Sequence, residues 1–145
     1  MADNQTQAPP PVQPPPPTTP ASPPPSPESQ ARIWNMLCHL SALAGFVVPF
    51  GNILGPLIVW QIKKNEFPSV DVHGKASLNF QITVSFVLIA GVAVAFITSF
   101  FCIGYLLFPV VFLIGLAGLV FAVIAGIKAN NGEDYKYPWS LELVK

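Results

Sequence analysis

The feature that most constrains the fold of this chain is the distribution of its charged residues, which are missing from two long stretches. Between Ile33 and Ile127, every charged side chain lies in one short stretch, Lys63 to Lys75 (KKNEFPSVDVHGK). About a quarter of the residues in a water-soluble domain are usually charged, whereas only 10% are charged here. The apolar blocks on either side therefore predict a membrane domain, with the charged stretch as a loop at the membrane surface.

The first apolar block, residues 33–62, is too long for one crossing. A straight helix over this block would be about 45 Å long, against a hydrocarbon core of about 30 Å. The Pro-Phe-Gly-Asn sequence from Pro49 to Asn52 is typical of a turn. The block therefore predicts a helical hairpin. The helices predicted for the whole chain span about 33–48, 53–64, 74–99 and 106–128.

These four helices predict an all-α fold, a four-helix transmembrane bundle in residues 32–145. This arrangement puts every Lys and Arg on one side of the membrane. Because cytoplasmic segments are enriched in Lys and Arg, we expect a multi-pass protein of the bacterial plasma (inner) membrane with both termini in the cytoplasm. Each arm of the first hairpin is only about 20 Å long, so whether this hairpin spans the bilayer fully stays open.

A Pro-rich tail, residues 1–31, precedes the membrane domain and is predicted to be disordered. Its proline runs at 9–11, 14–17 and 23–25 predict an extended polyproline II chain, because proline fixes φ and donates no backbone hydrogen bond. Repeated PxxP sequences would suit a cytosolic polyproline-binding partner. However, the nearest basic flank is Arg32, so a semi-rigid spacer is the favoured interpretation.

A few polar side chains within or next to the apolar blocks define a candidate functional face. Lys75, Asn79 and Thr83 are spaced by four residues and so share one face of a helix. His39 has no metal-site spacing around it, so we interpret it as an interhelical hydrogen-bonding residue. The candidate residues of this face are His39, Asn52, His73, Lys75, Asn79 and Thr83.

Small residues recur at a spacing of four in the last two predicted helices. They are Gly91 and Ala95 in one helix, and Gly118, Ala122 and Gly126 in the other. Rows of small residues let helix backbones approach closely. We expect these rows to pack the two helices together, and self-association with a second copy is the alternative.

The chain contains no recognisable catalytic motif. A nucleophile elbow, a P-loop, a dinucleotide fingerprint and an HExxH sequence are all missing. Asp71, His73 and Lys75 are close enough in sequence for acid–base chemistry, but a solvated loop with Asp71 at a helix N-terminus explains them more simply. The chain is therefore predicted not to be an enzyme and to have no catalytic residue, metal site or cofactor. Without a basic stripe, no nucleic-acid partner is expected either.

Three sequence runs resemble the bacterial domain of unknown function 4870 family over about residues 31–145. They read WNMLCHLSALAGFVVPFGNILGPLIVWQIKK, HGKASLNFQIT and IKANNGEDYKYP. The resemblance implies a small four-helix membrane protein, distantly similar to the channel-like subunit of the chloroplast inner-envelope import translocon. It implies no defined activity. The motif positions occupied here are His39, Pro49, Gly51, Asn52, Gly55, Pro56, Lys63, Lys64, Gly74, Lys75, Asn79, Phe80, Gln81, Asn130, Gly132, Tyr135 and Pro138.

Three hypotheses for function follow from these features. The leading one is a translocon-like or membrane-perturbing module that assists polypeptide passage or insertion, because helices of unequal length create a hydrophobic mismatch with the bilayer. The second is a membrane anchor that presents the polyproline tail to a cytosolic partner. The third, a small-solute channel or transporter, is disfavoured because no intramembrane charge marks a pathway. The expected partners are the lipid bilayer and, as open alternatives, other membrane proteins or a second copy.

Overall fold

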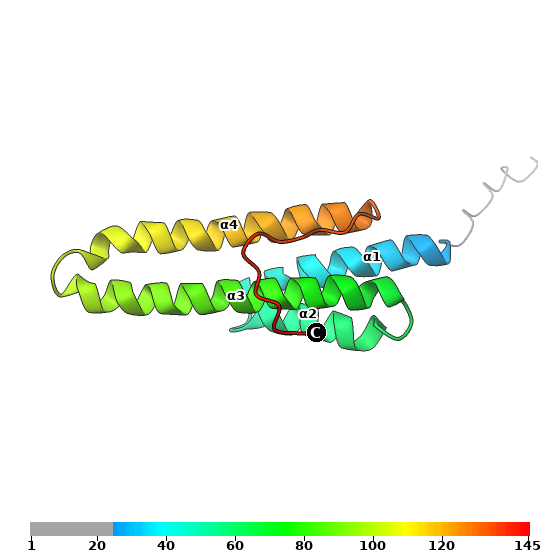
Figure 1. Ribbon diagram of the computed structural model, residues 1–145, viewed down its shortest axis with the longest axis horizontal. Helices are drawn as coiled ribbons and strands as arrows, with labels where there is room; N and C mark the ends of the chain where they lie inside the picture. The colour runs from blue at the N-terminus through cyan, green and yellow to red at the C-terminus, as the bar shows by residue number, and fades with distance from the viewer. Residues whose placement is uncertain (1–24) are drawn as a thin grey trace, which may run out of the picture.

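The computed structural model describes residues 25–145, and the regular structure within them is entirely helical (Figure 1). The elements in chain order are α1 (Pro27–Leu40), the 3-10 helix η1 (Ser41–Phe46), α2 (Gly51–Lys63), α3 (Pro68–Ser99) and α4 (Gly104–Asn130). The all-helical prediction is thus confirmed for this part of the chain. The proline runs of the predicted tail lie in residues 1–24, outside the described residues, except for Pro25. The prediction of a disordered tail is wrong for residues 27–31, which form the first turns of α1.

The helices form two hairpins of unequal length. α3 and α4 have 32 and 27 residues, whereas α1 and α2 have 14 and 13. α1 and α2 therefore lie beside only one end of the longer pair (Figure 1). By length and composition, α3 and α4 could each cross a membrane. α1 and α2 are shorter than the roughly 20 residues that a crossing needs, so a bundle of four spans stays a prediction.

α1 begins earlier than the predicted start at Ile33. The Ser26 hydroxyl oxygen accepts a hydrogen bond from the backbone N–H of Ser29 (3.2 Å), so Ser26 caps the helix. Pro27 follows as the first helical residue, where its missing N–H costs nothing. Local capping chemistry therefore extends the helix beyond the apolar block.

α3 also begins earlier than predicted, at Pro68 instead of Gly74. Pro68 again occupies the first turn, and Asp71 lies there as the acidic residue expected at a helix N-terminus. The predicted surface loop from Lys63 to Lys75 is therefore wrong in its extent. It consists of a short turn followed by the first two turns of α3.

The arms of the short hairpin are in direct backbone contact because α2 presents glycines to η1. A Cβ atom on Gly51 would overlap the carbonyl oxygen of Ala44, and one on Gly55 would overlap that of Ser41. The helix predicted over residues 33–48 is thus divided between the end of α1 and η1. Side chains at these two glycine positions would force the arms apart.

The rows of small residues lie at two helix contacts. An added Cβ would lie 3.0 Å from a Val111 methyl at Gly91 and 3.1 Å from a Val84 methyl at Gly118, so these glycines are at the α3–α4 contact. The expected packing against α3 is wrong for Gly126, because an added Cβ there would lie 2.9 Å from the Leu40 side chain, at the α4–α1 contact. The alanines of the rows, Ala95 and Ala122, are buried.

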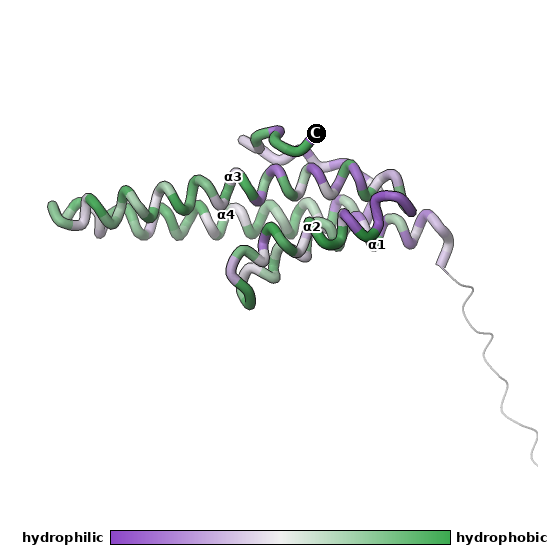
Figure 2. The backbone as a smooth tube through the Cα atoms, turned by 90° about the horizontal axis from the view of Figure 1, so that it is seen from below, coloured by the Kyte–Doolittle hydropathy of each residue, from purple (hydrophilic) through white to green (hydrophobic). Residues whose placement is uncertain are grey.

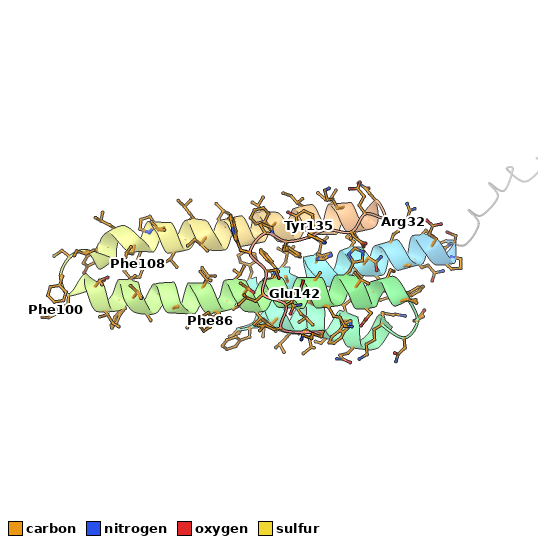
Figure 3. All side chains as sticks on the ribbon, in the orientation of Figure 1. Arg32, Phe86, Phe100, Phe108, Tyr135 and Glu142 are labelled. Carbon is orange, nitrogen blue, oxygen red and sulfur yellow. The ribbon has the colours of Figure 1, made fainter. Side chains whose placement is uncertain are left out.

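Charged and apolar residues are separated along the length of the molecule (Figure 2). No charged residue occurs between Lys75 and Lys128. The uncovered half of α3 and α4 instead exposes large apolar side chains, such as Phe86 and Phe100 (Figure 3). Arg32, a residue of α1, lies at the opposite end (Figure 3).

Candidate functional site

A line of hydrogen bonds joins α1, α3 and the C-terminal segment inside the covered half of the protein. His39 Nδ1 lies 2.8 Å from the Tyr137 hydroxyl oxygen, and His39 Nε2 lies 3.1 Å from His73 Nδ1. His73 Nε2 is 3.5 Å from a carboxylate oxygen of the exposed Asp134. His39 therefore forms one interhelical hydrogen bond, to His73 of α3, and one hydrogen bond to Tyr137 of the C-terminal segment. His73 was expected on a surface loop, but it is buried because that stretch belongs to α3.

Tyr137 fastens the C-terminal segment to the bundle. Its ring stacks on Phe80 with ring centroids 4.0 Å apart and an interplanar angle of 12°. Burial raises the pKa of the Tyr137 phenol. The hydroxyl thus stays protonated at neutral pH and remains paired with His39. These contacts attach the C-terminal segment to α1 and α3.

Asp71, His73 and Lys75, which are close in sequence, do not converge in space. The Trp60 indole N–H donates to one carboxylate oxygen of Asp71 (2.8 Å), and the Lys75 ammonium donates to the other (2.6 Å). His73 instead faces His39 and Asp134. Asp71 lies in the first turn of α3 and links this helix to α2 through Trp60, so the stretch is helical and not the solvated loop of the simpler interpretation.

The predicted polar face of α3 is covered by the C-terminal segment, which crosses α4 and α3 after α4 ends (Figure 1). The Asn79 side-chain oxygen Oδ1 accepts hydrogen bonds from the backbone N–H groups of Leu143 (2.9 Å) and Val144 (2.6 Å). The Asn79 side-chain Nδ2 donates to the backbone carbonyl oxygen of Val144 (3.0 Å). The Thr83 hydroxyl accepts the Leu141 N–H (3.0 Å). Asn79 and Thr83 therefore bind the chain itself.

The remaining candidate, Asn52, lies in a groove where the short hairpin ends against α3 and α4. The side-chain Nδ2 of Asn52 donates to the hydroxyl oxygen of Ser85 (2.8 Å) and to the side-chain oxygen Oε1 of Gln81 (3.3 Å). We call these three side chains the polar patch. Within residues 25–145 they form no other hydrogen bond with each other or with other side chains, leaving the Gln81 amide and the Asn52 carbonyl oxygen available.

The groove itself is largely apolar and has a volume of about 350 Å³. Phe46 and Phe50 line it from the hairpin tip, and Leu88 and Ile89 from α3. Figure 2 shows the tip of the short hairpin diverging from the axis of α3 and α4. The groove is lined by residues of this tip and of both long helices. The polar patch therefore lies at the wall of an apolar groove.

Gln81 and Ser85 were not among the predicted functional residues. They are spaced by four in an otherwise apolar stretch, and this pattern places both on one helix face. That spacing could have identified them. Their pairing with Asn52 depends on contacts 29 and 33 residues apart, which spacing does not reveal.

The described residues offer no clear metal site. Between residues 25 and 145, no group of three or more His, Cys, Asp or Glu side chains is placed to hold an ion. Cys38 is buried, Cys102 is exposed, and both thiols are free.

The family model that matches this chain is described as the Magnetosome magnetite crystal formation protein family, and the match covers residues 30–144. The predicted assignment to the domain of unknown function 4870 family is therefore wrong. Motif residues that carried it, such as Gly55 and Asn79, have structural roles in the hairpin and the C-terminal contact, so they indicate the fold more than the family. No curated protein and no solved structure matches the chain.

Proposed function

Because this chain belongs to the magnetosome magnetite crystal formation protein family, we propose that it is a multi-pass membrane protein that acts by binding another membrane polypeptide, without catalysis. α3 and α4 cross the bacterial inner membrane, and both termini and the α2–α3 turn face the cytoplasm. The one-sided charge supports this topology, because Lys and Arg are enriched on the cytoplasmic side.

Two lysine–aromatic pairs support placing the charged end at a membrane surface. The Lys63 ammonium lies 4.7 Å from the centre of the Trp34 ring, and the Lys64 ammonium lies 4.7 Å from that of Trp60. Tryptophan is enriched at membrane–water interfaces, and lysine side chains extend towards the headgroups. Both pairs lie at the charged end, so this end belongs at the membrane surface.

The polar patch is the observation that carries the proposed binding. Polar side chains that face lipid are costly unless they meet protein or water. The groove beside Asn52, Gln81 and Ser85 is apolar and open along α3. It therefore suits a membrane-spanning segment that brings one polar side chain to the patch. A protein that assists the insertion of polypeptides must first bind the segment to be inserted. The insertion role predicted from the sequence is therefore part of this proposal.

Two synthetic membrane-spanning peptides test this binding. One has Asn at the centre of a Leu/Ala helix, and the other has Leu at that position. Interhelical polar contacts in membranes contribute about 0.6–2 kcal/mol, so we expect the Asn peptide to bind about 3- to 30-fold more tightly. Energy transfer between labelled peptide and labelled protein in vesicles measures both affinities.

Matched variants locate the preference at the groove. Gln81→Leu with Ser85→Ala should remove the preference for the Asn peptide. Thr98→Val should preserve it, because Thr98 is also on α3 but lies near the turn between α3 and α4, residues 100–103, which we call the far turn. Equal binding of the two peptides to the unmodified protein would contradict the proposed function.

The family match supports a second proposal, that the chain contributes to magnetite crystal formation. Expression in a magnetite-forming bacterium that lacks its own member of this family tests it directly. We expect the chain to restore crystal number or size in electron micrographs, and the Gln81→Leu/Ser85→Ala variant to restore less. A chain that reaches the membrane without changing the crystals would refute this role.

A further inference from the structure

The tip of the short hairpin reaches about half the length of the membrane-spanning pair. Phe46 and Phe50 at the tip line the same groove as Ile89 of α3 and Gly115 of α4. From Ile89 to the end of α3 at Ser99 the helix rises about 15 Å, and from the start of α4 to Gly115 about 16 Å. Each value is close to half of a hydrocarbon core about 30 Å thick. If the far turn lies at one membrane surface, the hairpin tip lies near the midplane.

The surface of the short hairpin indicates what covers it. At its tip, Phe46 is 76% exposed, Val47 84% and Phe50 63%. A stripe along α2 continues this apolar surface towards the charged end through Leu54, Ile58 and Ile62, which are 44%, 56% and 66% exposed. The apolar surface stops where Lys63 and Lys64 begin. Acyl chains of a single leaflet match its polarity and its length.

We propose that α1 and α2 insert into the cytoplasmic leaflet only, so that the protein is a wedge which favours membranes convex on the side of its termini. This inference depends on the proposed topology, in which α3 and α4 cross the bilayer. One leaflet then holds four helices and the other holds two. With a helix diameter of about 10 Å, the two extra helices add roughly 160 Å² of cross-section to the cytoplasmic leaflet. Extra area in one leaflet is accommodated best where that leaflet is convex.

Cysteine accessibility tests the depth of the tip separately from the topology. Val47→Cys in a Cys102→Ser background should resist a membrane-impermeant thiol reagent added from either side of native membranes. Glu66→Cys in the same background should react from the cytoplasmic side, and native Cys102 from the opposite side. The buried Cys38 should stay unlabelled in all of them. Reaction of Val47→Cys from the side of Cys102 would show a fully spanning hairpin and overturn the wedge. Reaction of Cys102 from the cytoplasm would overturn the topology.

Tethers pulled from giant vesicles test the shape. An impermeant dye added outside labels Glu66→Cys/Cys102→Ser only in molecules whose termini face outwards. Added to the unmodified protein, it labels Cys102 only in molecules whose termini face inwards. We expect the first population to be enriched several-fold on a narrow tether relative to the flat membrane, and the second to be depleted. Equal densities of both populations on tether and vesicle would overturn the proposal.

A tip variant links the effect to the short hairpin. Val47→Glu adds a charge where the side chain is 84% exposed, so the packing of the bundle is preserved while insertion of the tip is opposed. Enrichment on tethers should fall towards one. Unchanged enrichment would show that the hairpin is not the cause. Cross-links between Val47→Cys residues of two copies, together with no enrichment on tethers, would mean that a second copy packs against the tip of the short hairpin. This outcome would also refute the wedge.

Discussion

Replacing Asn79 should release the C-terminal segment from α3 without unfolding the bundle. Asn79 forms three hydrogen bonds to this segment, two as acceptor and one as donor. Burial contributes little there, because Leu141 and Leu143 are 54% and 58% exposed. The polar contacts of Asn79 should therefore dominate the docking of residues 141–144.

The magnitude follows from the number of bonds. A typical intramolecular hydrogen bond contributes about 0.5–1.5 kcal/mol net, so Asn79→Ala should cost roughly 1.5–4.5 kcal/mol of docking free energy. At 1.36 kcal/mol per factor of ten, amide hydrogen exchange at Leu143 and Val144 should accelerate about 10- to 2000-fold. Thr83→Val removes only the bond to the Leu141 N–H, so its effect should be about 2- to 13-fold.

Hydrogen exchange with mass spectrometry, on protein in detergent or nanodiscs, measures this directly. The accelerated exchange should be confined to the C-terminal peptide, because the opening is local. Unchanged exchange in Asn79→Ala would refute the docking role of Asn79. Accelerated exchange throughout α3 would show instead that the segment and the bundle unfold as one unit.

Two further predictions concern stability. Gly55→Ala should lower the thermal unfolding temperature strongly, because the new Cβ would overlap the Ser41 backbone. Gly115→Ala is the control: its Cβ would lie 3.6 Å from the Leu88 side chain, so it should be neutral or gain up to about 1 kcal/mol from helix propensity. Equal shifts in the two variants would contradict the backbone contact at Gly55. Tyr137→Phe should cost about 0.5–1.5 kcal/mol at neutral pH through the lost bond to His39. Burial raises the pKa of Tyr137 in the folded protein, so with rising pH the phenol of the unfolded chain loses its proton first. The unmodified protein should therefore lose stability as the pH rises above about 10. The Tyr137→Phe variant has no phenol at this position and should not show this loss. Parallel stability curves for both proteins in denaturant, measured from pH 8 to 11, would refute the second prediction.

The helical architecture could be predicted from the sequence because it depends on local signals. Long uncharged stretches indicated the helices, and the glycines and prolines from Pro49 to Pro56 indicated the hairpin. The helix starts were missed because capping by Ser26, and proline in the first turn, extend helices beyond their apolar residues.

The contacts that define the candidate site could not be predicted in the same way. Asn79 and Thr83 were identified as one helix face, but the segment that covers them lies about 60 residues later in the chain. His73 follows the charged turn in sequence, yet it is buried because α3 starts before it. Spacing reports which residues share a helix face, and only the packed fold shows what that face meets.

The far turn of the long hairpin has a consequence for biogenesis. The residues between α3 and α4, from Phe100 to Ile103, include no charge. Carrying charged groups through the hydrocarbon layer is the most expensive part of placing a polypeptide in a bilayer. In the proposed orientation, this turn is the only connection between the helices of residues 25–145 that has to be translocated. The described part of the chain can therefore enter from the ribosome's side as two preformed hairpins, without moving a charged connection across the hydrocarbon layer.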